Sequence, residues 1–144
     1  RLFRAKLGLR AEEDGDLDLI QSLLTLMAEG EADFTRTFRG LTDGTARDEF
    51  TDREAFDRWA ELWQARLSRE TGDPAELMRG ANPWIIPRNH RVEEAIAAAV
   101  AGDMAPFRTL FDAVTHPRDR RPEWDDLAAA PLSEQIVHQT FCGT

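Results

Sequence analysis

Hydrophobic residues recur three and four positions apart along most of this chain, the spacing that puts side chains on one face of an α-helix. One such stripe consists of Leu17, Ile20, Leu23, Leu24 and Met27. Similar patterns predict helices over about 1–9, 31–41, 52–70 and 74–81, with two more after residue 90. No segment alternates apolar and polar residues for long enough to form a strand. We therefore predict an all-α fold with six to seven short-to-medium helices in one irregular helical domain, 1–144.

Helix start signals support this assignment. Thr51 and Glu54 have the spacing of a capping box and open the longest predicted helix. Asp73 followed by Pro74 gives a cap and a proline at the first helical position. The longest helix carries three aromatic residues at helical spacing, which predicts a large buried surface. These residues are Phe56, Trp59 and Trp63.

The segment 82–90 interrupts the helical pattern. Pro83 and Pro87 bracket three large apolar residues, and each proline disfavours helix at the residue before it. We expect this connector to be pinned into a core, with Asn82, Arg88 and Asn89 bonding local backbone. It separates a helical group at 1–81 from a helical hairpin at 91–115.

The hairpin is predicted from two helical stripes joined by Gly102 and Asp103. The buried stripe of the second helix is predicted to be Met104, Phe107, Leu110, Phe111 and Val114. An Ala-rich face on the first helix would let Phe107 and Phe111 of the second approach closely and become buried. The segment 116–144 is predicted as loop and extended tail, with Trp124 anchoring the loop back on the hairpin.

Composition sets the broad class. The chain has 144 residues, 42% hydrophobic, and a net charge of −9. That charge argues against a nucleic-acid partner, and no apolar run is long enough for a membrane partner. The first residue is Arg1, already in a helical pattern, so we expect a piece of a longer protein. Residues 11–33 hold eight carboxylates and no Lys or Arg; they form either a solvated helix face or a docking surface for a basic partner.

A search for chemistry finds no active site. Asp14, Asp16 and Asp18 open like a calcium-binding loop, but Leu19 and Thr25 stand where that loop needs Gly and Glu. The three histidines are far apart in the sequence, without metal-ligand spacing. They are His90, His116 and His138. No Gly-rich phosphate loop is present.

The single cysteine, Cys142, is the one reactive candidate. It lies next to Gly143 near the end of the sequence, and it is either an incidental tail thiol or a thiol exposed and mobile enough to reach another thiol. It is not the fourth residue from the end, so it is not a prenylation box. With only one cysteine the chain has no internal disulfide, which fits a reducing compartment.

An ordered set of motifs resembles the C-terminal region of the selenoprotein O family, which includes the bacterial YdiU-type proteins. The resemblance runs through essentially the whole chain. The motifs are Ala32–Arg39, Asp48-Glu49-Phe50, Trp59, Asn82-Pro83 with Arg88-Asn89, Ala95-Ile96, Gly102-Asp103-Met104, Arg121-Pro122-Glu123-Trp124 and Cys142.

The resemblance implies a protein adenylyltransferase. Family members have a kinase-like fold, bind ATP in a flipped orientation with Mg²⁺ or Mn²⁺, and transfer AMP to Ser, Thr or Tyr of protein substrates. Their nucleotide-contacting and metal-binding residues belong to the upstream kinase-like domain, the expected partner of this region within the same chain. No catalytic, cofactor-binding or metal-binding residue is therefore expected here, and the bacterial protein is expected in the cytoplasm.

The resemblance also implies a role for Cys142. The matching position is selenocysteine in some animal members, and in bacterial relatives a cysteine there is thought to gate activity through a redox bridge. Here the sequence ends Cys142-Gly143-Thr144 where other members have Cys-Ser-Ser. Two hypotheses remain: a supporting or redox-regulatory helical domain of an adenylyltransferase, and a stand-alone acidic helical protein-interaction module.

Overall fold

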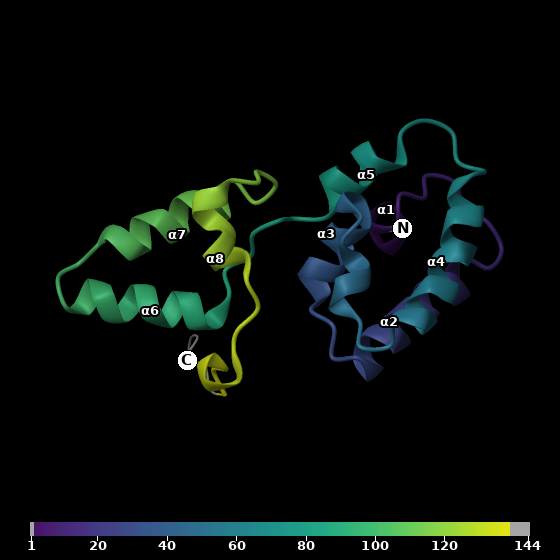
Figure 1. Ribbon diagram of the computed structural model, residues 1–144. Coiled ribbons are helices and arrows are strands. Elements are labelled where there is room, and N and C mark those ends of the chain that lie inside the picture. The colour runs from purple at the N-terminus through teal and green to yellow at the C-terminus, as the bar shows by residue number, and fades with distance from the viewer. Residues whose placement is uncertain (1, 139–144) are drawn as a thin grey trace, which may run out of the picture. The chain divides into compact units, whose positions relative to one another are not determined.

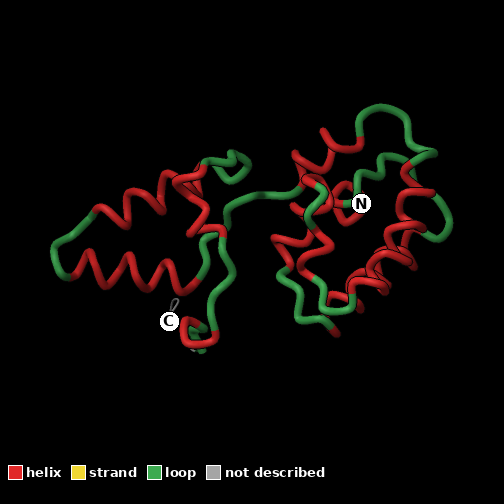
Figure 2. Tube along the Cα trace, viewed as in Figure 1, coloured by secondary structure: helices red, strands yellow, loops and turns green. Residues whose placement is uncertain are grey.

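A computed structural model describes residues 2–138, which form helices and loops with no strand among them (Figures 1 and 2). The α-helices are α1 Leu2–Lys6, α2 Asp16–Glu29, α3 Phe34–Asp43, α4 Arg53–Leu67, α5 Pro74–Ala81, α6 Asn89–Val100, α7 Ala105–Thr115 and α8 Asp125–Ala128. Short 3-10 helices are η1 Ala46–Glu49, η2 Pro122–Trp124 and η3 Ser133–Gln135. The all-α prediction is confirmed. The extra helix relative to the predicted six to seven is α8, inside the segment 116–144 that was predicted as loop and tail.

Backbone contacts divide the chain after Pro83 into two compact units. The first unit holds α1 to α5 and the second holds α6 to α8. The boundary falls inside the predicted connector 82–90, where two prolines prevent helix α5 from continuing into α6. The assignment of 1–144 to one domain stays a prediction.

Side-chain caps set where several helices begin. Asp73 accepts a hydrogen bond from the backbone N–H of Ala75 at 2.9 Å, with Pro74 at the first helical position, as predicted. The predicted capping box at Thr51 is wrong by one residue. Asp52 caps α4 by accepting from the Ala55 N–H at 2.9 Å, and α4 begins at Arg53. Both residue types are common helix caps. Here the Asp52 carboxylate accepts from a free N–H of the first turn, whereas the Thr51 hydroxyl donates to the oxygen of Gly30.

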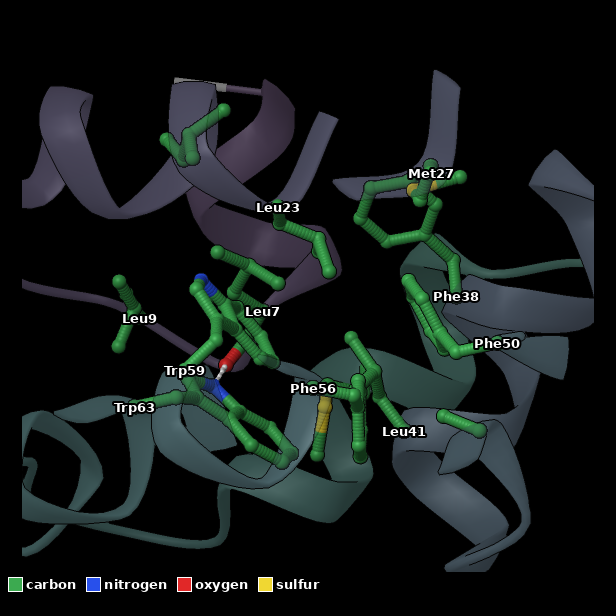
Figure 3. Packing of buried hydrophobic residues seen from close by; sticks show 13 residues of the cluster. Leu7, Leu9, Leu23, Met27, Phe38, Leu41, Phe50, Phe56, Trp59 and Trp63 are labelled. Atoms are coloured by element: carbon green, nitrogen blue, oxygen red, sulfur yellow. Dashed lines mark hydrogen bonds between the residues drawn. The ribbon is translucent and has the colours of Figure 1, made fainter. Parts of the chain in front are cut away.

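The core of the first unit is built around the aromatic stripe of α4 (Figure 3). Trp59 and Trp63 stack with ring centroids 5.5 Å apart, and both are at most 5% exposed. Their indole N–H groups donate to the backbone oxygens of Leu19 and Leu7, each at 2.9 Å. The polar edge of each buried ring is therefore satisfied. The predicted burial of this stripe is confirmed.

Asn82 connects three helices of the first unit. Its side-chain amide donates to the backbone oxygens of Lys6 in α1 and Phe38 in α3, at 2.9 and 3.2 Å. The Lys6 ammonium donates to the Asn82 Oδ1 at 3.3 Å, and the Arg39 guanidinium to the Asn82 backbone oxygen at 3.1 Å. The side chain is fully buried. Asn82 does bond backbone as predicted, but its partners are 44 and 76 residues away rather than local.

A buried ion cluster holds the start of α2 against the end of α4. The Arg66 guanidinium lies 2.7 Å from both the Asp16 and the Glu70 carboxylates, and all three side chains are at most 5% exposed. Hydrogen bonding to Asp16 raises the pKa of Arg66. Burial alone would raise the pKa values of Asp16 and Glu70, but hydrogen bonds from Arg66 and from backbone N–H groups hold both below their ordinary range.

The second unit has its own small core of Ile85, Ala113, Trp124 and Ala128. The backbone N–H groups of Trp84 and Ile85 both donate to the oxygen of Pro117, at 2.6 and 3.1 Å. The apolar part of the connector is therefore held to the loop after α7. Trp124 is 2% exposed and packs in the same cluster as Ala113 of α7, which confirms the predicted anchor.

The predicted burial of the α7 stripe is wrong for its larger residues. Leu110 and Ala113 are buried, but Met104, Phe107 and Phe111 are 40%, 45% and 59% exposed. A seam between two helices covers only a narrow strip of each, and the apolar stripe of α7 is wider than that strip. The remaining residues need another surface to become buried.

We expect Arg66→Ala to lower the free energy of unfolding by about 3–5 kcal/mol, because it leaves two buried carboxylates without their counter-ion. Arg69→Ala is the matched control. Arg69 pairs with Glu13 at 2.8 Å but is 53% exposed, so its loss should cost at most about 1 kcal/mol. Urea unfolding of both variants measures the difference. Equal losses would contradict a structural role for the buried cluster.

Candidate functional site

The feature most like a binding site is a hollow of about 330 Å³ at the start of α6. Pro87 disfavours helix at the residue before it, and Arg88 has extended backbone, so α6 begins at Asn89. Arg88 makes no side-chain cap to the helix. The lining residues are Ile86, Pro87, Arg88, Asn89, His90, Pro131, Gln135, Ile136 and Val137.

His90 is the titratable residue of this hollow that stands out. Its side chain is buried, and its Nε2 has no hydrogen-bond partner among the residues described. Burial lowers the pKa of His90, and the charge of Arg91 lowers it further against a smaller opposing effect of Glu94. The imidazole is therefore held in its neutral form near pH 7.

The groups around His90 do not form a catalytic set. No Asp, Glu, Ser or Cys is among the described residues that line the hollow. A histidine that acts as a general base needs a nucleophile or substrate proton within hydrogen-bond reach, and usually a group that orients the ring. The arrangement fits a structural residue of the connector better than an acid or base.

The other histidines also stand apart. His116 stacks on Trp124, and its Nδ1 lies 2.9 Å from the backbone oxygen of Asp112. His138 is exposed near the end of the described residues. Asp16, one residue of the rejected calcium-loop pattern, forms an ion pair with Arg66. Over residues 2–138, no three His, Cys, Asp or Glu side chains come together as a possible metal site.

Another hollow, of about 800 Å³, lies in the first unit between the end of α2 and the start of α4. Most of its polar groups already have partners. Arg47 makes a bidentate ion pair with Asp57, and Asp52 caps α4. Thr51 donates to the oxygen of Gly30. Such a surface offers little unused hydrogen-bonding capacity to a ligand.

The arginines of the 118–121 segment stack on tryptophans. Arg120 lies 4.5 Å from the Trp84 ring and Arg121 lies 4.4 Å from the Trp124 ring. These cation–π contacts hold the loop to the second unit. They explain the basic cluster without a phosphate ligand.

The acidic segment 11–33 is partly used inside the structure. Glu12 pairs with Arg4, Glu13 with Arg69, and Asp16 with Arg66, while Asp33 caps α3. The arginines come from outside the segment, so sequence spacing gave no sign of the pairs. Asp14, Asp18, Glu29 and Glu31 are exposed, and so is Glu12, which is 75% exposed in its pair with Arg4.

Cys142, the predicted redox candidate, lies outside the described residues 2–138. Within those residues, none of the helices has the length and apolar character that a membrane span requires.

Fold and site together define a helical region with a packed core, whose described residues bring no catalytic set together. Sequence comparison then gives its family. The profile of Protein adenylyltransferase SelO matches residues 1–115, and the chain belongs to this family.

Curated relatives agree with this assignment. The chain is 56% identical over 144 residues to the Protein nucleotidyltransferase YdiU of Ruegeria sp. (strain TM1040), covering 100% of this chain and 30% of that protein. It is 50% identical to the protein of that name from Roseobacter denitrificans, over 96% of this chain and 29% of the relative. The protein of that name from Rhizobium meliloti is 47% identical, over 99% of this chain and 31% of the relative. The chain thus spans about 30% of the length of the relatives it matches.

We expect His90 to make stability depend on pH in a defined window. The unfolded chain binds a proton near the ordinary histidine pKa of about 6.5, whereas the folded chain resists protonation. The stabilisation from the neutral His90 is therefore complete above about pH 6.5. It is lost as the pH falls from there through the lower pKa of His90 in the folded state.

The measurement is urea unfolding at pH 7.5 and at pH 5.5 for the parent, His90→Gln and His116→Gln. The His90 variant should lose less stability on acidification than the parent. His116→Gln is the control for the loss of a histidine whose side chain is exposed. Identical pH dependence in all three would contradict the assignment to His90.

Proposed function

We propose that this chain is the helical C-terminal region of a protein adenylyltransferase, which transfers AMP from ATP to Ser, Thr or Tyr hydroxyls of protein substrates. The observation that carries the proposal is the family match over residues 1–115. The name of the relatives, protein nucleotidyltransferase, describes the same class of reaction.

In this proposal the region supports the enzyme and holds no active site of its own. The described residues offer a neutral, isolated His90, paired carboxylates and stacked arginines, which supports a structural role. ATP and Mg²⁺ or Mn²⁺ would bind the kinase-like domain, which belongs to the roughly 70% of the relatives' length that this chain does not match. A cytoplasmic location and a redox role of Cys142 belong to the same proposal and derive from the resemblance alone.

The alternative is an acidic helical module that binds a basic partner. Half of the eight carboxylates in 11–33 already have partners within the first unit. Their engagement favours the supporting role over a free docking surface.

The test is AMP transfer by the full-length protein. With Mg²⁺ or Mn²⁺, label from the α-phosphate of ATP should become protein-bound, and label from the γ-phosphate should not. The chain of 144 residues alone should transfer neither label. Transfer of γ-label by the full-length protein would contradict AMP transfer. Transfer of α-label by this chain alone would contradict a supporting role.

A further inference from the structure

Five large apolar side chains of the α6–α7 hairpin are exposed, and we call them the hairpin apolar face. Their exposed fractions range from 40% for Met104 to 86% for Val100. The members are Ile96 and Val100 on α6, Met104 at the N-cap of α7, and Phe107 and Phe111 on α7.

These residues lie on the same side of the hairpin. On α6, Ile96 and Val100 are rotated from the buried Ala95 in the sense in which the helix winds. On α7, Phe107 and Phe111 are rotated from the buried Leu110 in the same sense. The two helices are antiparallel, so flanks displaced in the same sense from the seam fall on one side of the pair. The rings of Phe107 and Phe111 are already stacked, with centroids 6.2 Å apart.

The opposite side of the hairpin is covered. Ala113 of α7 is fully buried against Ile85, Trp124 and Ala128, which come from the connector and the loop after α7. The second unit therefore closes one side of the hairpin and leaves the other bare. Proteins rarely expose a contiguous group of large apolar side chains unless it meets a partner surface.

The comparisons indicate what covers it. All of this chain aligns with relatives of which it forms only about 30%, so about 70% of their length lies outside it. The family match at 1–115 includes the complete hairpin. A second copy is a poorer occupant, because a net charge of −9 on each chain opposes self-association.

We propose that the hairpin apolar face docks against the part of the full-length chain that lies outside these residues. This inference rests on the proposed function in taking the region as part of a longer enzyme. It adds the surface through which the region is attached, and it assigns a role to aromatic residues that the helical core of the second unit leaves unused.

The experiment follows methionine oxidation in the full-length protein. Native and denatured protein are treated with hydrogen peroxide, and peptide mass spectrometry gives the ratio of the two oxidation rates for Met104 and for Met78. Met78 is 4% exposed and serves as the buried reference, whereas Met104 is 40% exposed here. We expect oxidation of Met104 to be slowed at least about tenfold on folding, close to the slowing at Met78, because susceptibility follows exposure. Slowing of less than about threefold at Met104 would overturn the proposal.

Two substitutions in the full-length protein test the face itself. Phe111→Glu should restore rapid oxidation of Met104, because it places a charge in the docked face. Thr109→Glu is the matched control, with the same new charge at an exposed position on the other side of α7. Equal oxidation of Met104 in the two variants would overturn the proposal. The proposal would also be overturned if the slow oxidation of Met104 disappeared on dilution to a concentration at which sedimentation shows a monomer. That result would assign the face to a second copy.

The outcome is separable from that of the AMP-transfer assay. Transfer of α-label with an unprotected Met104 would leave the proposed function standing and remove this inference. Protection of Met104 without transfer of α-label would support the docking of the hairpin apolar face and contradict the proposed function.

Discussion

The first unit depends on the burial of Asn82, one polar side chain that must be fully hydrogen-bonded. Its amide donates to backbone oxygens of α1 and α3, so removing it would delete two hydrogen bonds from the core. The Arg39 guanidinium uses the Asn82 backbone oxygen, which helix α5 leaves free where it ends. Pro83 follows and prevents further helix. Hydrogen-bond satisfaction thus fixes where α5 stops and which helices meet there.

The same requirement explains why so few charged groups remain for chemistry. Arg66 forms ion pairs with Asp16 and Glu70 in the core, and Arg120 and Arg121 lie over tryptophan rings. His90 is held neutral by its surroundings. An active site needs groups whose protonation or nucleophilicity is directed at a substrate. Here the groups just named are directed at the protein itself, which agrees with the proposed supporting role.

Sequence reasoning succeeded where the signal was local. Helical periodicity located the helices, Asp73-Pro74 marked the start of α5, and three aromatic residues marked the core face of α4. It failed where the outcome depended on distant residues. The ion cluster joins residues about 50 positions apart, and no local spacing announces such a pair. Periodicity identified the apolar stripe of α7 but could not say whether a second surface exists to cover it, so Phe107 and Phe111 were wrongly assigned to the core.

For the candidate site, the expectation that no catalytic, cofactor-binding or metal-binding residue lies in this chain stays a prediction, whereas the family resemblance is confirmed by the match over 1–115. We propose that this region lacks a nucleotide site and belongs to an enzyme that has one. Calorimetric titration with ATP and Mg²⁺, on this chain and on the full-length protein, tests the proposal. We expect saturable binding by the full-length protein and none by this chain. Saturable, micromolar binding of ATP by this chain alone would contradict it.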